Sequence, residues 1–173
     1  REPIQIENQQ LIQDIKGKRI LVTGAAGSIG SELVRLLNKL EPTILILCDQ
    51  AETPLHNIEL ELNDQHSQVQ CIPYLTDINN KVRMTALFEK FKPHVVYHAA
   101  AYKHVPMMEF NPEEAIKVNA LGTQLLADLA IKYKVERFVM ISTDKAVNPT
   151  NVMGASKRLA EMYVQALSTH PHE

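Results

Sequence analysis

Five short runs of apolar residues recur along the chain, separated by segments in which the apolar positions follow a longer, helical spacing. Uninterrupted runs such as Ile20, Leu21 and Val22 are typical of strands buried on both faces of a parallel sheet. The runs predict strands over residues 19–23, 43–48, 69–74, 94–99 and 137–142. The helical spacing predicts helices over residues 28–39, 52–62, 80–91, 112–133 and 152–167.

This alternation of strand and helix predicts an α/β fold with a doubly wound parallel sheet, because parallel neighbours need right-handed crossover connections. We expect the strand order 3-2-1-4-5. Ligands of such sheets bind beyond the carboxyl ends of the strands, near the point where the strand order reverses. Chemistry is therefore expected directly after Thr23, Cys48, Tyr74, Ala99 and Ser142.

The two ends of the chain suggest a larger context. Residues 1–17 are polar and irregular, with a short helix expected over residues 9–15, and form a lead-in to one domain over residues 18–173. The chain begins at Arg1 without an initiator Met and stops at Glu173 just after a helical pattern. We therefore expect it to be a segment of a longer parent protein.

Composition narrows the class of protein. The 173 residues are 45% hydrophobic and 22% charged, as in one ordinary globular domain. The net charge of −2, with acids and bases interspersed, disfavours a nucleic-acid-binding protein, which would show a basic face. No apolar run approaches the roughly 18 residues of a transmembrane helix, so this segment should not span a membrane. Cys48 and Cys71 lie in apolar runs and are expected to be free thiols of a cytoplasmic domain.

The segment that links the first strand to the first helix is rich in glycine. It reads TGAAGSIG from Thr23 to Gly30, which has the form TGxxGxxG. Glycines allow a tight turn and let the backbone approach a pyrophosphate, while the helix N-terminus offers unpaired N–H groups to the anion. The expected dinucleotide contacts of this turn are Gly24, Ala26, Gly27, Ser28, Ile29 and Gly30.

Acidic residues after the second and third strands extend this pattern. Asp49, beside Gln50, can accept hydrogen bonds from the adenosine ribose hydroxyls and would repel a 2′-phosphate, so both residues are expected at the cofactor. With no Arg beside Asp49, NAD is favoured over NADP. Asp77 is expected to hydrogen-bond the adenine amino group while Ile78 packs on the ring. The alternative for Asp77 is a cap of the following helix.

These residues resemble the extended short-chain dehydrogenase/reductase superfamily, from about Lys18 to the end of the chain. Two longer stretches, AAAYKHVP at residues 99–106 and STDKAVNPTNVMGASK at residues 142–157, narrow the resemblance. They are similar to the nucleotide-sugar 4,6-dehydratases of bacterial surface-polysaccharide synthesis, and most similar to the branch that acts on UDP-N-acetylglucosamine. The resemblance implies a Rossmann-like, NAD-binding fold with Ala99, Ala100 and Ala101 at the cofactor.

The chain also departs from the superfamily pattern. The usual Tyr-x-x-x-Lys pair is Met153 and Lys157 here. A Met at this position resembles larger, membrane-associated members of the branch, which implies a cytoplasmic domain of a parent anchored in the bacterial inner membrane. The family's C-terminal substrate lobe is expected to lie beyond Glu173.

The resemblance implies dehydration by transient oxidation of the sugar. NAD takes a hydride from C4, a base removes the C5 proton, an acid protonates the departing C6 hydroxyl, and the hydride returns to C6. The family's acid and base match Asp144 and Lys145, Thr143 would orient the C4 oxygen, and Lys157 would bind the nicotinamide ribose. A lysine base must be partly neutral, which requires burial or a nearby cation.

Other polar residues have more open assignments. Lys103 and His104 follow the fourth strand and are expected at the UDP-sugar substrate, although Lys103 could meet the cofactor or solvent instead. His98 and His104 have no Cys, Asp or Glu at ligand spacing, so no metal site is expected. Asn119 resembles the superfamily Asn that ties its helix to the active-site strand.

Three functions remain open on the sequence alone. The first is an NAD-dependent 4,6-dehydratase, a lyase that acts on UDP-N-acetylglucosamine in the parent protein. The second is a nucleotide-sugar epimerase or reductase, although those enzymes usually need the missing Tyr. The third is an inactive NAD-binding module, because the sugar lobe is absent. Apolar surface left open on the last helix could also drive formation of a homo-oligomer.

Overall fold

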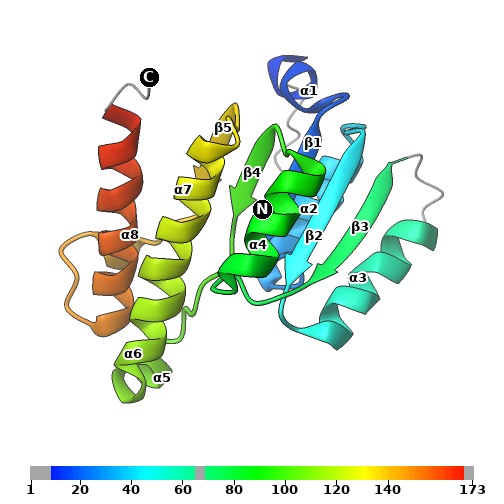
Figure 1. The fold of residues 1–173 in the computed structure, drawn as a ribbon. Helices are drawn as coiled ribbons and strands as arrows, with labels where there is room; N and C mark the ends of the chain where they lie inside the picture. Colours follow the sequence, from blue (N-terminus) through cyan, green and yellow to red (C-terminus); the bar gives the residue numbers. More distant parts are fainter. Residues whose placement is uncertain (1–8, 65–68, 170–173) are drawn as a thin grey trace.

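A five-stranded parallel sheet forms the centre of the protein. The computed structural model describes residues 9–64 and 69–169, and its strands lie in the order β3-β2-β1-β4-β5 (Figure 1). They are β1 Arg19–Thr23, β2 Ile44–Asp49, β3 Gln70–Leu75, β4 Val95–His98 and β5 Arg137–Met140. All four pairings are parallel. The expected fold class and strand order are confirmed, and each strand end lies within two residues of its predicted place.

The main helices also match the sequence pattern, with one exception. They are α2 Ser28–Asn38, α3 Glu52–Asp64, α4 Lys81–Phe91, α7 Thr123–Lys132 and α8 Val152–Thr169. The single helix predicted over residues 112–133 is instead three segments. These are α6 Pro112–Ala115, the π-helical η1 Ile116–Gly122, and α7. The short helix α5 Val105–Phe110 and the 3₁₀ turn η2 Asp144–Ala146 were not predicted.

Helices cover both faces of the sheet because successive strand side chains point to opposite sides. Ile20 and Val22 of β1 pack into an apolar core with residues of α2 and α3. Leu21, between them, packs into a second core with residues of α4 and α7. Helix α8 contacts α7 and completes that second layer (Figure 1). The uninterrupted apolar runs of the sequence therefore correspond to strands covered on both faces.

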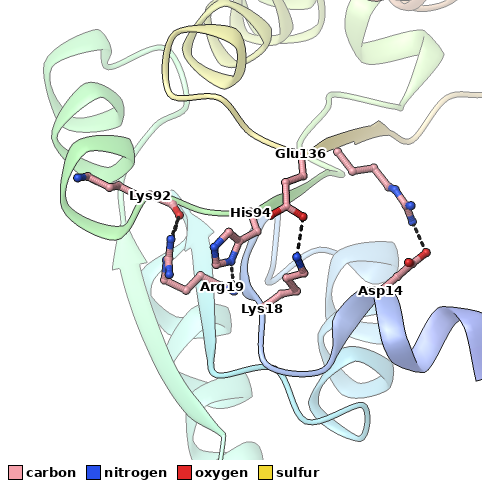
Figure 2. Close-up of polar contacts among 7 residues, drawn as sticks. Asp14, Lys18, Arg19, Lys92, His94 and Glu136 are labelled. Carbon is pink, nitrogen blue, oxygen red and sulfur yellow. Dashed lines mark hydrogen bonds and ion pairs between the residues drawn. The ribbon is translucent and has the colours of Figure 1, made fainter.

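One arginine makes several contacts at the end of the sheet where the central strand β1 begins. The Arg19 guanidinium donates to the carbonyl oxygen of Phe91 at 2.8 Å, at the C-terminal end of α4. It also donates to the carbonyl oxygen of Lys92 at 2.9 Å (Figure 2). A cation there satisfies carbonyls that lack helical partners. The Arg19 amide also donates to Nδ1 of His94 at 3.0 Å. Burial, and then the charge of Arg19, lower the pKa of His94, in agreement with an unprotonated Nδ1.

The lead-in helix α1, Gln9–Ile15, packs against this same end of the sheet. Ile15 is 1% exposed and belongs to the core shared with α2 and α3. Asp14 pairs with Arg137 of β5 at 2.7 Å, beside the 2.7 Å pair of Lys18 and Glu136 (Figure 2). The second half of the expected lead-in is thus packed against the domain. Among the helices that the structure describes, none is long and apolar enough to cross a membrane.

Candidate functional site

A cleft runs along the carboxyl ends of β1, β2, β4 and β5. It consists of two adjoining cavities that share Gly27, Ala99, Ala101 and Tyr102. The first cavity extends toward the ends of β2 and β3, and the second toward the end of β5 and the start of α8. The cleft lies at the carboxyl end of the sheet, at the point between β1 and β4 where the strand order reverses.

Most of the sequence-predicted residues line this cleft. The first cavity is lined by Gly24, Ala26, Gly27, Asp49, Gln50, Asp77, Ile78, Ala99, Ala100 and Ala101. The second is lined by Ser28, Ile29, Gly30, Lys103, His104, Thr143, Lys145 and Lys157. Asp144, the expected acid, is not among the lining residues, and its side chain is 86% exposed. Tyr102 lines both cavities and was not predicted as a site residue.

The glycine turn is closed by contacts that leave no room for side chains. Gly24 adopts a φ of +67°, and a Cβ there would lie 2.5 Å from the Ala100 nitrogen. A Cβ on Gly30 would overlap the carbonyl oxygen of Gly24. The Gly27 amide donates to that same oxygen at 3.0 Å. Helix α2 begins directly after Gly27, so its first unpaired N–H groups lie at the cleft.

The carboxylate of Asp49 joins two turns at the end of the cleft near β2. Its Oδ2 accepts from the Ala26 amide at 3.0 Å, and its Oδ1 accepts from the Ala51 amide at 3.0 Å. These bonds fix the direction of the carboxylate, and each oxygen keeps one acceptor position. The side chain is thus oriented to receive a pair of hydroxyl donors from a ligand in the first cavity.

Asp77 and Ile78 both lie at this end of the cleft, as predicted from the sequence. Asp77 Oδ1 accepts from the Asn79 amide at 2.8 Å, which makes a local turn. The cap of α4 is instead Asn80, whose side chain accepts from the Arg83 amide. Asp77 is therefore not the helix cap that was its alternative explanation. Ile78 is 5% exposed and packs close to η1.

At the opposite end of the cleft, three consecutive polar residues follow β5. The Thr143 hydroxyl donates to Asp144 Oδ1 at 3.0 Å, and Lys145 Nζ donates to the same oxygen at 3.3 Å. The Thr143 hydroxyl, and then the Lys145 ammonium, lower the pKa of the Asp144 carboxyl. Asp144 is therefore an anion at neutral pH.

The lysine of α8 is buried beside this segment. Lys157 is 4% exposed and donates to the Ile141 carbonyl oxygen at 2.7 Å. Burial lowers its pKa, and the nearby Glu161 partly opposes that change. Met153, one turn earlier, is 2% exposed and packs with Met108 of α5 while it also lines the cleft. In the sequence it stands where the superfamily usually has a Tyr.

Lys103 points toward the start of α2. Its ammonium donates to the Ser28 hydroxyl at 3.0 Å, which brings a positive charge to the helix N-terminus. His104 lies further along the cleft, where a third cavity opens against α5.

A buried hydrogen-bond network connects the two ends of the cleft from below. His98 is fully buried, and its Nδ1 and Nε2 lie 2.7 Å and 2.8 Å from the hydroxyls of Thr23 and Thr123. Thr123 donates its single hydroxyl proton to the Asn119 carbonyl oxygen at 2.6 Å. Nε2 of His98 must then be the donor to Thr123, and Nδ1 the acceptor from Thr23. Burial, reinforced by Lys157, lowers the pKa of His98 to about 3.

Asn119 extends this network to the loop after β4 and to α8. Its side chain accepts from the Tyr102 amide at 2.8 Å and donates to the Tyr102 carbonyl at 3.0 Å. The same amide donates to the Ser156 hydroxyl in α8 at 3.0 Å. The expected tie between this helix and the active-site strand is thus made to the loop after β4 and to α8. Within the described ranges, no three His, Cys, Asp or Glu side chains gather as a metal site.

Comparison with known proteins identifies the family. Residues 20–173 match the family described as "Polysaccharide biosynthesis protein", so the chain belongs to it. The chain is 47% identical to the capsular polysaccharide biosynthesis protein CapD of Staphylococcus aureus, over 97% of this chain and 28% of CapD. It is 36% identical to an inverting UDP-N-acetylglucosamine 4,6-dehydratase of Campylobacter jejuni, over 82% of this chain and 41% of that enzyme. The resemblance stated from the sequence is confirmed.

A solved relative agrees with the fold. The structure of a UDP-glucose 4-epimerase from Thermotoga maritima with UDP-glucose superimposes with a TM-score of 0.76 and 26% identity. The match covers 88% of this chain and 52% of the epimerase. The chain therefore spans between a quarter and about half of the proteins that it resembles. These relatives modify nucleotide sugars or synthesise polysaccharides, according to their names.

Proposed function

We propose that this chain is the NAD-binding half of a nucleotide-sugar 4,6-dehydratase whose substrate is UDP-N-acetylglucosamine. One observation carries the proposal: the glycine turn and the proton-transfer residues Thr143 and Lys145 line adjoining cavities of one cleft. A dinucleotide that lay along this cleft would extend from Asp49 to Lys157. The 36% identity to a named UDP-N-acetylglucosamine 4,6-dehydratase supports the choice of reaction.

The residues at the adenosine end fit a dinucleotide. Gly24 and Gly30 allow the turn to pack tightly against Ala100 and on itself, and Gly24, Gly27 and Gly30 line the cleft where a pyrophosphate would lie. The start of α2 offers N–H donors to that anion, and Lys103 adds a positive charge through Ser28. The free acceptor positions of Asp49 suit two ribose hydroxyls, and its negative charge disfavours a 2′-phosphate. NAD is the cofactor that these groups favour.

Bound NAD would supply a reversible hydride acceptor, and the C5 proton of the sugar becomes acidic once C4 is a ketone. Thr143 would accept the proton of the C4 hydroxyl while it passes its own proton to Asp144, along the 3.0 Å bond between them. The anionic state of Asp144 makes it ready to take this proton. Thr143 would thus replace the hydroxyl that Met153 lacks.

The same proton can then serve the second step. Asp144, once protonated, is the acid that gives a proton to the departing C6 hydroxyl, which leaves as water. Lys145 acts here as the free amine, a form in which it no longer makes the ion pair with Asp144; it takes the C5 proton and later returns it to C5. Each residue ends in its starting protonation state, so one turnover releases one water without a net proton. Lys157 would hold the nicotinamide ribose with the donors that Ile141 does not use.

The reaction is tested in the longer protein that carries this chain. We expect UDP-N-acetylglucosamine in heavy water to lose water, gain a C6 methyl group and take up deuterium at C5, as followed by proton NMR. Asp144→Asn and Lys145→Ala should abolish the reaction and leave NAD bound, whereas the distant control Lys132→Ala should behave as the wild type. An unchanged sugar, or turnover in either variant, would refute these roles.

A sugar epimerase is the second candidate, because the structural relative from Thermotoga maritima carries that name. The same NMR experiment separates the two, since an epimerase changes C4 and leaves the C6 hydroxyl in place. The isolated chain is tested by calorimetry. We infer that residues outside it complete the sugar site, so it should bind NAD more tightly than NADP and should not bind the UDP-sugar. Turnover by the isolated chain would contradict this inference.

A further inference from the structure

Helix α8 contacts two consecutive residues at the end of β5. Lys157 Nζ donates to the Ile141 carbonyl oxygen at 2.7 Å. One helical turn later, Glu161 Oε1 accepts from the Ser142 hydroxyl at 2.5 Å. Residues four apart share one face of a helix, so both side chains reach the strand end together. Because Thr143 follows Ser142 directly, these two contacts define where the Thr143–Lys145 segment leaves the sheet.

We propose that Glu161 is a positioning residue, which clamps Ser142 and supplies the counter-charge for Lys157 at the cleft. This inference deepens the proposed function and rests on it, because Lys157 matters there only if it meets the cofactor. Glu161 itself does not line either cavity of the cleft. It acts through its two neighbours, Ser142 on the strand end and Lys157 on its own helix.

The carboxylate of Glu161 is held at both oxygens. Oε1 accepts from Ser142, while Oε2 accepts from the Arg158 guanidinium at 3.0 Å. The side chain is 19% exposed, and the Ser142 hydroxyl is the first cause of a lowered pKa for this carboxyl. Glu161 is therefore ionised at neutral pH and cannot turn away without losing both bonds. A fixed anion suits a structural clamp and a counter-charge equally.

Lys157 needs such a counter-charge because it is almost fully buried. Removal from water disfavours the ammonium form, and burial is the first cause of its lowered pKa. Glu161 acts in the opposite direction and raises that pKa. His98 of β4 also interacts with Lys157, but its pKa of about 3 leaves it neutral at pH 7. Lys103 and Lys145 line the same cavity as Lys157. The nearby anion Asp144 is 86% exposed and is held by Thr143 and Lys145, whereas Glu161 is the carboxylate whose charge raises the pKa of Lys157.

The two parts of the proposal are separated by two variants of this chain. Glu161→Gln keeps a carbonyl oxygen for Ser142 but removes the charge. Ser142→Ala removes the hydrogen bond and leaves both charges in place. Arg158→Gln is the matched control, since it removes the other partner of the same carboxylate. The Lys157 ammonium is titrated by NMR with isotope-labelled lysine, and amide hydrogen exchange is measured at residues 146 and 147, whose N–H groups bond within the segment.

We expect Glu161→Gln to lower the pKa of Lys157 and to make NAD affinity fall at a lower pH than in the wild type. Ser142→Ala should speed amide exchange at residues 146 and 147 severalfold. Arg158→Gln should not lower the pKa of Lys157, because it removes a cation. An unchanged Lys157 titration in Glu161→Gln, or unchanged exchange in Ser142→Ala, overturns the proposal. A wild-type chain that fails to bind NAD would refute the proposed function, while the titration and exchange results, which need no ligand, still decide the role of Glu161.

Discussion

Gly24 and Gly17 offer an internal comparison of what a glycine contributes. Both adopt a left-handed backbone, with φ of +67° and +73°. A Cβ on Gly17 would meet nothing within 4 Å, whereas one on Gly24 would lie 2.5 Å from the nitrogen and 2.7 Å from the Cα of Ala100. Substitution by Ala therefore adds backbone strain at both positions but a collision with backbone at Gly24 alone.

The magnitudes follow from these two effects. The left-handed conformation costs a residue with a Cβ about 1–2 kcal/mol, which is the whole expected loss for Gly17→Ala. Forcing extra volume into a packed region costs typically about 1–3 kcal/mol more, so Gly24→Ala should lose roughly 2–5 kcal/mol. The collision cannot be relieved by rotating a side chain, because Ala100 offers only backbone atoms there.

The assay is urea unfolding of the wild type and both variants, with a shift of the midpoint at constant slope. NAD binding is measured on the same samples by calorimetry. Gly17→Ala should retain the affinity for NAD, because Gly17 lies just before β1, at the end of the sheet opposite the cleft. Gly24→Ala should weaken it at least tenfold. The reasoning fails if Gly24→Ala is no less stable than Gly17→Ala, or if it binds NAD as the wild type does.

Three further predictions concern stability and reactivity. The pKa of His98 is about 3, against 6.5 for an ordinary histidine. Between these two pH values the unfolded state binds one more proton than the folded state. The free energy of unfolding should therefore fall by about 1.4 kcal/mol per pH unit as the pH drops from 6.5 toward 3. Urea midpoints at pH 7 and 5 should show this slope, and an equal slope in His98→Gln would contradict it. In the same assay, Ile15→Ala should destabilise the chain by about 2–5 kcal/mol, because Ile15 is buried. Asp14→Asn should cost less than about 1 kcal/mol, because the ion pair of Asp14 is exposed. Similar losses in the two variants would refute the docking of α1. Burial raises the pKa of the Cys48 thiol to about 12 and that of the Cys71 thiol to about 11. A thiol reagent at pH 8 should therefore label Cys48 only after unfolding. Rapid labelling of Cys48 in the native state would argue against its burial in β2.

The fold was largely predictable because the strands are buried on both faces. A strand such as β1 must be apolar throughout, and this constraint is local enough to be visible in the sequence. The π-helical segment η1 was not predictable in the same way. Its geometry accompanies contacts of Asn119 with Tyr102 and Ser156, which lie 17 and 37 residues away along the chain. The helical spacing of apolar positions cannot predict contacts between residues so far apart in the sequence.

The candidate site was predictable where one short segment carries the chemistry. The glycine turn is an example, since its residues are close in sequence and the cleft forms around them. The environment of a side chain was harder to predict. Asp144 matches the family's acid in sequence, yet its side chain is mostly exposed and paired with Lys145. Tyr102 and Glu161 were missed because their importance depends on partners that follow β2 and β5 or lie in η1.

The carboxylate of Asp49 has a consequence for engineering the preference between cofactors. It accepts from the amides of Ala26 and Ala51, and it lines the cavity where we propose that the ribose binds. A substitution made to admit a 2′-phosphate would therefore leave two backbone donors without acceptors, at a cost of about 1–3 kcal/mol each. A designer would need a second substitution that restores an acceptor between the two turns. If Asp49 selects the cofactor as proposed, a change of cofactor preference cannot be separated from the geometry of the glycine turn.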